Sequence, residues 1–466
     1  MTSITRVLAV PAMGAYYYDD LAALQSRSIP LPERYTAAPA TPGFRHVREV
    51  AEAVSVGLAL DDNQVAWGDC VAVEFSGQAG RDPIFRAEEG LATIQCTVAP
   101  ALRSREITSF HELAAELDAL VESVEISRPL PSPKANRGPK EVSRRDLLTA
   151  PARLLRPEGA EGQEDEKAVM ERVTVERRLH TAIRYGVSQA LLKAVALTRG
   201  VTMAEVIADE WGLPLPDAMV PIHAQSGRER YHNADKMIVR QVASLPHALV
   251  DNIPEQLGQD GTELTRYARW LKARIHELGG EDYRPTVHLD VHGALGQIYE
   301  NNLGRVLGQL YALEQAVQPY PLRVECPVIM ESREAQIETM ETLRDYVRLR
   351  KVNVQLVADE WANTLEDIRA FVEAQAADMI QIKMPDLGGV HNTVEAVLVC
   401  KSGGIGAFLG GSCAETDLSA RVAVHVALAT RPDLIMAKPG MGVDEGIMLV
   451  QNEMARTLAW IRARET

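Results

Sequence analysis

The chain has few of the residues that nucleic-acid-binding and membrane proteins need. Aromatic residues make up only 5% of its 466 residues, and acidic side chains outnumber basic ones to give a net charge of -15. Phosphate backbones are bound by clustered Lys and Arg, and unpaired bases stack on aromatic rings, so no nucleic-acid partner is expected. No apolar stretch approaches the ~18 residues of a membrane span, so no membrane partner is expected either.

Cysteine is also scarce, and its distribution excludes a disulfide framework or a zinc knuckle. The five cysteines form no CxxC pair, and they are Cys70, Cys96, Cys326, Cys400 and Cys413. An odd, dispersed set of this kind predicts a reducing compartment, the cytoplasm. The short apolar start is broken by Pro11 and predicts a first strand instead of a signal peptide.

The length and composition predict a globular protein with two domains. The chain is 46% hydrophobic and 24% charged, which is ordinary for a folded enzyme, and its length exceeds one domain. Residues 1–125 mix strand and helix signals without a βα repeat. They predict a small α+β domain, with a hairpin over 54–75 that turns at 61–63 and an amphipathic helix over 110–124.

Residues 126–171 differ from the rest of the chain. Prolines punctuate this segment, and its charge is basic at first and acidic afterwards. It predicts a long surface loop, with one short helix around 144–155. Two interpretations stay open, a solvated insertion without chemistry and a mobile flap or subunit-contact arm.

From residue 178 onward, strand and helix signals alternate. Eight strand candidates in about 220 residues predict a (β/α)8-type barrel. The strands are expected at 219–226, 247–252, 285–293, 322–328, 353–361, 379–385, 405–411 and 434–438. Helices are expected at 181–198, 264–278, 335–350, 365–375 and 444–464.

Three acidic residues stand near the ends of consecutive strand candidates. Asp290 follows TVHL, Glu325 follows LRV and Asp359 follows VQLVA, at intervals of 35 and 34 residues. One βα repeat has about this length, so the strand ends meet on one rim, where barrel enzymes hold their active sites. Carboxylates that converge in this way repel one another unless a divalent cation lies among them. The pattern therefore predicts a metal site.

Lys383 lies 24 residues after Asp359, in an otherwise apolar run. Gln381, two residues earlier, points to the same side of the predicted strand. Because a charged lysine is costly to bury, two interpretations stay open. Lys383 is either the ion-pair partner of a neighbouring acid, or a general base that burial and the metal charge keep neutral. The metal decides between them.

Histidines also occur on the predicted barrel strands. His288, Asp290 and His292 alternate along one strand and so face one side. Zinc hydrolases with such a string have an HxH pair on the first strand, where this chain has only His223, so His288 is interpreted as a core residue. His247 lies on the second strand, across the barrel mouth from Lys383, and a base on each side would address opposite faces of a bound carbon centre.

Several long strings resemble methylaspartate ammonia-lyase of the enolase superfamily. The similarity covers residues 1–125 and 172–466. The strings are GDCVAVEFSGQAGRDP, RLHTAIRYGVSQA, VTMAEVI, AQSG, LPHAL, VADEW, QIKMPDLGGV and AKPGMGVDEG.

The resemblance implies a fold, a metal and an assembly. An N-terminal α+β capping domain, residues 1–171 including the 126–171 insertion, covers a modified TIM barrel of residues 172–466 whose last helix returns toward the cap. The family is usually a homodimer. Mg²⁺ is implied at Asp290, Glu325 and Asp359, often with a supporting monovalent cation such as K⁺.

The resemblance also implies roles for individual residues. Lys383 removes the C3 proton of L-threo-3-methylaspartate, and His247 on the opposite face serves the other C3 epimer. Mg²⁺ stabilises the resulting enediolate, which expels ammonia and leaves mesaconate. The substrate's carboxylates and amino group are bound by Gln225, Gln381, Ser412 and Cys413, and its C3 side chain lies near Glu74 and Met436.

Five positions depart from the family pattern. Glu74 stands where glutamine is usual, Met436 for leucine, Ser412 for threonine, His223 for phenylalanine and His292 for tyrosine. Most of these changes add polarity near the pocket. They leave open the same elimination, or the reverse amine addition, on an aspartate with a more polar or basic substituent on C3 or nitrogen.

Two other classes of protein are weighed against this lyase. An enolase-superfamily racemase or dehydratase commonly has a KxK motif on the second strand, but residues 247–252 contain no lysine. A non-catalytic scaffold would be expected to lose a metal ligand, but all three acids are present. The resemblance thus implies an enzyme that acts on a small amino diacid.

Overall fold

The computed structural model describes residues 2–26, 29–129, 170–227 and 229–465. Contacts divide the chain into two compact units. The larger unit contains residues 1–120 and 179–466, and the smaller contains residues 121–178. The predicted domain boundary between residues 171 and 172 stays a prediction.

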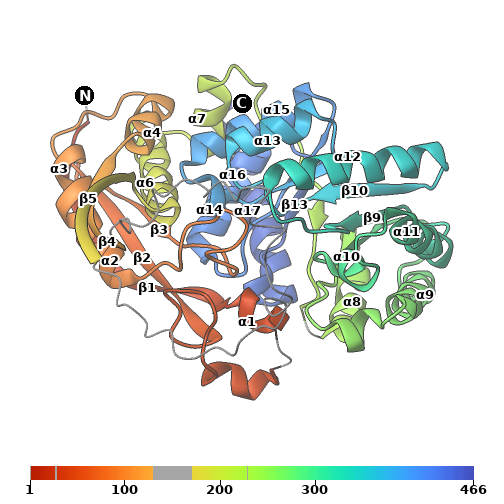
Figure 1. Cartoon of the computed structure of the whole chain (residues 1–466). Coiled ribbons are helices and arrows are strands. Elements are labelled where there is room, and N and C mark those ends of the chain that lie inside the picture. The colour runs from red at the N-terminus through yellow and green to blue at the C-terminus, as the bar shows by residue number, and fades with distance from the viewer. Residues whose placement is uncertain (1, 27–28, 130–169, 228, 466) are drawn as a thin grey trace, which may run out of the picture. The chain divides into compact units, whose positions relative to one another are not determined.

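A three-stranded antiparallel sheet dominates the N-terminal part of the larger unit (Figure 1). Its strands are β1 (Ile4–Asp19), β2 (Arg48–Leu60) and β3 (Val65–Cys70). The predicted hairpin is confirmed in β2 and β3, where the Leu60 amide donates to the Gln64 carbonyl at 2.8 Å and Asn63 has a φ of 67°. The confirmed hairpin ends in the loop that leads to Glu74.

Helix α6 (Thr181–Arg199) packs closely on strand β3. A Cβ atom on Gly68 would lie 2.1 Å from the Gly186 carbonyl oxygen, and one on Gly186 would lie 2.4 Å from the Cys70 amide nitrogen. Both positions therefore require glycine for the helix to reach the strand. The short helices of this part are α1 (Leu21–Ser26), η1 (Leu31–Tyr35), α2 (Ala87–Thr93), η2 (Ile94–Val98), α3 (Ala99–Leu102) and α4 (Phe110–Asp118).

The helix predicted over 110–124 is shorter than expected. Ser109 caps the amide of Glu112, and α4 ends at Asp118. Residues 121–124 instead begin β4 (Val121–Pro129), which pairs antiparallel with β5 (Met170–Arg178) in the smaller unit. Pairing with a distant strand overrides the helical periodicity of residues 121–124.

The β4–β5 pair also corrects the ends of the predicted 126–171 loop. Residues 126–129 and 170–171 are strand residues, and Arg177 pairs with Glu122 across the ladder at 2.9 Å. The rest of the loop, including the helix expected around 144–155, lies outside the described residues.

The predicted barrel is confirmed. Within the described residues, eight strands form a closed barrel in the order β6-β7-β8-β9-β10-β11-β12-β13, and every pair is parallel. The strands are β6 (Ile222–His223), β7 (Ser244–His247), β8 (Thr286–Asp290), β9 (Leu322–Glu325), β10 (Val354–Ala358), β11 (Met379–Ile382), β12 (Gly406–Leu409) and β13 (Leu434–Met436).

The second barrel strand is the one that the sequence places wrongly. It was expected at 247–252, but it runs from Ser244 to His247. His247 and Ala248 have φ angles of 64° and 52°, which end the strand although the apolar run continues. His247 is therefore the last residue of its strand, at the carboxyl-end rim.

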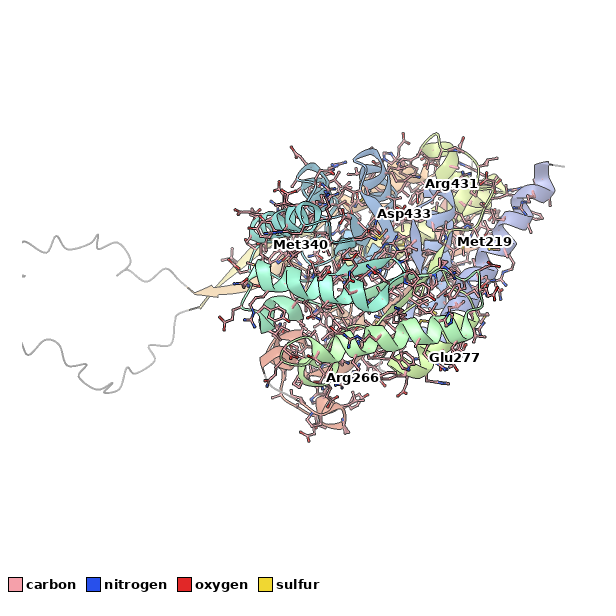
Figure 2. The ribbon with its side chains drawn as sticks, turned by 90° about the vertical axis from the view of Figure 1, so that its right-hand side faces the viewer. Met219, Arg266, Glu277, Met340, Arg431 and Asp433 are labelled. Carbon is pink, nitrogen blue, oxygen red and sulfur yellow. The ribbon has the colours of Figure 1, made fainter. Side chains whose placement is uncertain are left out.

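Helices surround the barrel between its strands. In Figure 2, the labelled Arg266 and Glu277 mark α9, which packs beside α11 and exposes its charged side chains to solvent. The larger helices are α7 (Met203–Glu210), α8 (Arg230–Val239), α9 (Thr262–Leu278), α11 (Leu303–Val317), α12 (Arg333–Leu349), α13 (Leu365–Glu373), α15 (Val390–Ser402), α16 (Asp417–Thr430) and α17 (Val443–Glu465). The short ones are η5 (Ile253–Leu257), α10 (Ala294–Ile298), α14 (Met384–Leu387) and η6 (Pro439–Met441).

The C-terminal helix α17 packs on α16 and α8, which are helices of the barrel. Its predicted return to the N-terminal domain stays a prediction. No described helix is long and apolar enough to span a membrane.

Candidate active site

Two of the predicted metal ligands face each other on adjacent strands. Asp290 ends β8 and Glu325 ends β9, and the two residues are paired in the parallel register. Glu325 in turn pairs with Val357 of β10, so Asp359 lies two residues further along the neighbouring strand. Period-two alternation gives these three side chains the same inward direction. The sequence spacing thus brings all three acids to one rim.

Asp290 and Glu325 are buried and hydrogen-bonded. Asp290 accepts the His292 amide at 2.9 Å and contacts His247 Nε2 at 3.3 Å. Glu325 accepts the Gln381 side-chain amide at 2.6 Å and lies 2.7 Å from His288 Nε2. Each carboxylate oxygen that accepts one hydrogen bond keeps a second lone pair, so both residues can still bind a cation.

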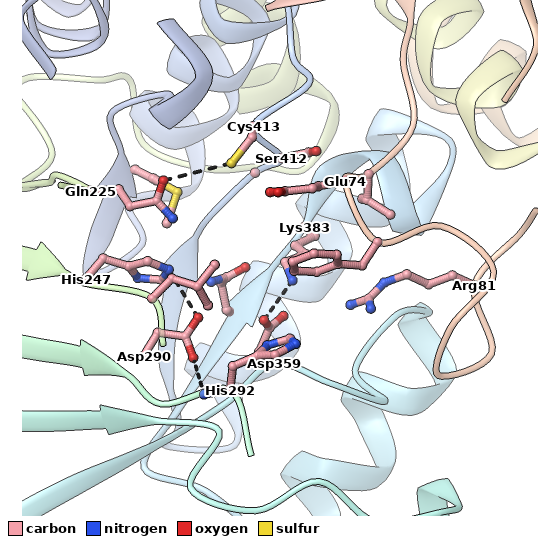
Figure 3. Close-up of a pocket in the computed structure, with 16 residues that line it drawn as sticks. Glu74, Arg81, Gln225, His247, Asp290, His292, Asp359, Lys383, Ser412 and Cys413 are labelled. Carbon is pink, nitrogen blue, oxygen red and sulfur yellow. Dashed lines mark hydrogen bonds and ion pairs between the residues drawn. The ribbon is translucent and has the colours of Figure 1, made fainter. Parts of the chain in front are cut away.

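Asp359 has a different partner, because its Oδ2 accepts a hydrogen bond from Lys383 Nζ at 2.7 Å (Figure 3). Lys383 comes directly after β11, and Glu360 Oε1 lies 4.0 Å from its amine. The other oxygen of Asp359, Oδ1, is buried without a hydrogen-bond partner among the described residues. Asp359 therefore offers one oxygen to the lysine and keeps one open.

The charges around Lys383 decide its protonation in this arrangement. Burial lowers the pKa of the Lys383 ammonium, but the neighbouring Asp359 and Glu360 carboxylates outweigh that effect and hold its pKa above the ordinary value. The structure therefore has Lys383 as a charged ion-pair partner, which is the first of the two interpretations left open by the sequence. A neutral amine requires that the charge of Asp359 be neutralised by something else.

The carboxylates do not form one tight group of three. Among the described residues, His247, Asp290 and Glu325 each bring one ligand atom within 4.8 Å of the others, whereas Asp359 is not part of that group. Asp359 is instead bound to Lys383. Burial, with the charges of Asp290 and Asp359, raises the pKa of Glu325 well above its usual range.

These features fit a divalent cation with oxygen ligands. Mg²⁺ prefers carboxylate oxygens, and the rim provides a partnerless oxygen on Asp359 and two acids whose charges repel each other. A cation among them would offset the repulsion and give the open oxygen a partner.

Three buried histidines, His223, His247 and His288, lie next to one another near the acids. His223 Nδ1 lies 3.0 Å from Ser244 Oγ, and its Nε2 lies 3.4 Å from His247 Nδ1. Burial lowers the pKa of both His223 and His288 well below the usual value, so these two imidazoles are neutral at pH 7. The sequence interpretation of His288 as a core residue is incomplete, because His288 also orients the Glu325 carboxylate.

A cavity opens above the rim. Figure 3 shows Lys383 and His247 on different sides of it, with Gln225, Ser412 and Cys413 along the wall away from Asp290 and Asp359. The predicted site residues that line it are Glu74, Gln225, His247, Asp290, Asp359, Gln381, Lys383, Ser412, Cys413 and Met436. Glu325 does not line the cavity but binds Gln381, which does, so the structure brings the predicted residues to one place.

Arg81 lines the same cavity but was not singled out from the sequence. Its guanidinium contacts Glu360 at 2.6 Å and Asp386 at 2.8 Å, and all three side chains are buried. Burial opposes ionisation of Glu360, but Arg81 and Lys383 lower its pKa to about 2. The only sequence signals were an arginine in a Gly-rich loop and a second acid beside Asp359.

A second buried pair supports the loop that carries Ser412 and Cys413. Lys438 Nζ contacts Glu415 Oε2 at 2.8 Å, and their side chains are 1% and 0% exposed. Glu415 also accepts the Ser412 amide at 3.0 Å and the Tyr185 hydroxyl at 2.7 Å. The pair therefore fixes the backbone of this cavity wall.

Replacing Lys438 with methionine is expected to reduce the free energy of unfolding by about 3–5 kcal/mol, because Glu415 is left as an unpaired buried charge. Urea unfolding of the wild type and the variant measures the difference. The Lys438→Met/Glu415→Gln double variant should recover part of the loss. A loss below about 1 kcal/mol in the single variant would mean that the pair carries little of the stability.

A closed parallel barrel whose strand ends direct acids and a lysine into one cavity is the architecture of enolase-superfamily enzymes. Comparisons with known proteins agree. The profile "Methylaspartate ammonia-lyase C-terminus" matches residues 214–463, and "Methylaspartate ammonia-lyase N-terminus" matches residues 2–130 and 149–212. The chain belongs to the methylaspartate ammonia-lyase family.

Individual relatives match over their whole length. Methylaspartate ammonia-lyase 2 of Carboxydothermus hydrogenoformans is 43% identical over 461 residues, which are 99% of each chain. The crystal structure of β-methylaspartase from Clostridium tetanomorphum, an Mg complex, is 40% identical with a TM-score of 0.81 and covers 99% of this chain and 100% of that one. The Citrobacter amalonaticus enzyme containing (2S,3S)-3-methylaspartic acid is 39% identical with a TM-score of 0.85 and the same coverage.

Proposed function

We propose that the protein is a Mg²⁺-dependent carbon–nitrogen lyase that eliminates ammonia from L-threo-3-methylaspartate to give mesaconate. The observation that carries this proposal is the ion pair of Lys383 with Asp359 at a cavity that Asp290 also lines. Asp290, Glu325 and Asp359 would hold the Mg²⁺. When bound, it supplies a positive charge that stabilises the charge developing on the substrate's carboxylate as the C3 proton leaves.

Lys383 is the proposed base for the C3 proton. In the ion pair with Asp359 it is charged and cannot accept a proton. Once the charge of Asp359 is neutralised, burial disfavours the ammonium form and the amine becomes a base. The ammonium is then regenerated by the proton taken from C3, and the C2–N bond breaks to release ammonia.

His247 is the proposed base for the other C3 epimer. It lies at the end of β7, on a different side of the cavity from Lys383 (Figure 3). Gln225, Gln381, Ser412 and Cys413 are proposed to bind the substrate's carboxylates and amino group through their amide, hydroxyl and backbone donors. Met436 and Glu74 then face the C3 substituent.

The relatives support the substrate and the metal. The Citrobacter amalonaticus structure contains (2S,3S)-3-methylaspartic acid, and the Clostridium tetanomorphum structure is an Mg complex. A homodimer, a supporting monovalent cation such as K⁺ and a cytoplasmic location stay predictions from the resemblance.

The proposal predicts that the purified protein converts 3-methylaspartate to an unsaturated diacid, because elimination leaves a double bond conjugated with a carboxylate. Ultraviolet absorbance and released ammonia measure the product. EDTA should stop the reaction and excess Mg²⁺ should restore it. The absence of both products at every Mg²⁺ concentration would reject 3-methylaspartate as the substrate.

A second candidate function rests on the position of Glu74. Glu74, an acid, faces the cavity. The same elimination, or the reverse amine addition, on an aspartate with a more polar or basic substituent would use this carboxyl group.

A further inference from the structure

Glu74 is an acid in the wall of the cavity, and it is not one of the proposed metal ligands. It follows strand β3, and its backbone carbonyl accepts the amide of Asp19 at the end of β1 at 3.2 Å. In Figure 3 its carboxyl group points into the cavity, between Lys383 and the loop with Ser412 and Cys413. The side chain is partly buried, so a ligand rather than bulk solvent is its natural partner.

The cationic side chains near Glu74 are engaged elsewhere. Lys383 binds Asp359 at 2.7 Å, and Arg81 binds Glu360 at 2.6 Å. Arg48 contacts Asp19 at 2.8 Å. In the described part of the chain, no Lys, Arg or His forms an ion pair with Glu74.

The surroundings of Glu74 disfavour a bare negative charge, mainly because the carboxyl group is buried. Burial raises the pKa of its carboxyl to about 8, and the charges of Asp19 and Asp251 add to that effect, while Arg48 and the Cys413 thiol act against it. The nearby Tyr16 phenol also has a raised pKa, about 12, because of burial and the charge of Glu74. A positive group on a ligand would favour the charged form of this carboxyl group.

We propose that Glu74 selects an aspartate derivative whose C3 or nitrogen substituent carries a second positive charge, such as a protonated amine. This inference rests on the proposed lyase function and names the substrate class of the same site. A methyl substituent would leave Glu74 either unpaired or protonated. A cationic substituent would form a partly desolvated ion pair with it, of the kind that discriminates strongly between ligands.

The test compares substrates that match in size and differ in charge. For the C3 position, these are 3-(2-aminoethyl)aspartate and 3-propylaspartate in the elimination direction. For the nitrogen position, they are ethane-1,2-diamine and propan-1-amine added to mesaconate in the reverse direction. The ratio of kcat/KM for the charged over the neutral partner is measured for the wild type and for Glu74→Gln, which keeps the shape and removes the charge.

For either the C3 pair or the nitrogen pair of substrates, the kcat/KM ratio of Glu74→Gln should be at least about tenfold lower than that of the wild type. The pair that shows this difference identifies the substituent that carries the charge. Glu74→Asp keeps the charge on a shorter side chain, so its kcat/KM ratio should lie between those of the wild type and Glu74→Gln. Glu88→Gln in the exposed first turn of α2 is the control for net charge and should leave the ratio unchanged.

A change below about threefold in both positions would overturn the inference. If 3-methylaspartate is still turned over in that case, the lyase proposal stands and only the role of Glu74 is wrong. If the wild type turns over none of the substrates, 3-methylaspartate included, the proposed function fails and the inference fails with it.

The charge state of Glu74 adds a pH signature. Because its pKa is raised to about 8, the carboxyl is neutral below that pH and charged above it. The wild-type ratio for the C3 pair should therefore rise as the pH increases through about 8. The groups that face Glu74 and set this pKa are Tyr16, Asp19, Arg48, Asp251 and Cys413. Glu74→Gln should show no such rise, and a rise of the same size in that variant would contradict the assignment.

Discussion

Lys383→Ala is expected to lower turnover of L-threo-3-methylaspartate by about a thousandfold, because the variant has no group to take the C3 proton. Lys383 is the one amine in hydrogen-bond contact with a rim carboxylate of this cavity among the described residues. Steady-state kinetics at saturating Mg²⁺ measures the loss. If His247 serves the opposite face, turnover of the L-erythro epimer should fall much less in the same variant.

Two controls separate this chemical role from a structural one. Lys272→Ala, on the outside of the barrel in α9, should leave kcat unchanged. The melting temperature of Lys383→Ala should rise when Mg²⁺ is added, as the wild type's does, because the three acids remain. Full L-threo activity in Lys383→Ala would reject it as the base.

Glu325→Gln is expected to have opposite effects on stability and activity. The Glu325 pKa is raised by burial and by Asp290 and Asp359, so the folded protein favours its protonated form. Above the ordinary carboxyl pKa, the folded wild type has to hold a proton on this group that the unfolded chain releases, so its stability falls as the pH rises from the ordinary toward the raised pKa. Without metal, the Glu325→Gln variant, whose side chain is uncharged, should therefore unfold at a higher temperature than the wild type at neutral pH.

With metal the order should reverse. Glu325→Gln removes one charged ligand, so Mg²⁺ affinity and kcat should each fall at least about a hundredfold. Gln381 and His288 can adapt to an amide, because Gln381 Oε1 and His288 Nδ1 are buried without partners in the described structure. Melting curves in EDTA measure the stability without metal. Titration calorimetry with Mg²⁺ measures the affinity for the metal. A variant that is less stable in EDTA and binds Mg²⁺ normally would contradict the proposed ligand.

The barrel was predictable because its signals are local. Apolar runs end in acids at regular intervals, and the structure places Asp290 and Glu325 at the last position of their strands. The second strand was misplaced because apolar residues continue beyond His247, and only the backbone turn at His247 and Ala248 ends it. The β4–β5 pair was missed because it joins segments on either side of a charged, Pro-rich stretch.

The contacts that the sequence did not reveal are mostly non-local. Arg81 meets Glu360 across 279 residues, and neither stands in a run that signals a contact. The pair of Lys438 with Glu415 supports the Ser412 loop from within the core, where a charge is normally excluded. The protonation of Lys383 could not be settled from sequence either, since it depends on a 2.7 Å contact with Asp359.

The proposed chemistry depends on one divalent cation bound among Asp290, Glu325 and Asp359, beside the amine of Lys383. Crystals grown with Mn²⁺ in place of Mg²⁺ test it directly through anomalous scattering. We expect one strong anomalous peak bounded by oxygens of these three carboxylates, and we expect Asp359→Asn to weaken that peak. A peak at the His223, His247 and His288 imidazoles instead, or none at the carboxylates, would rule out this metal site.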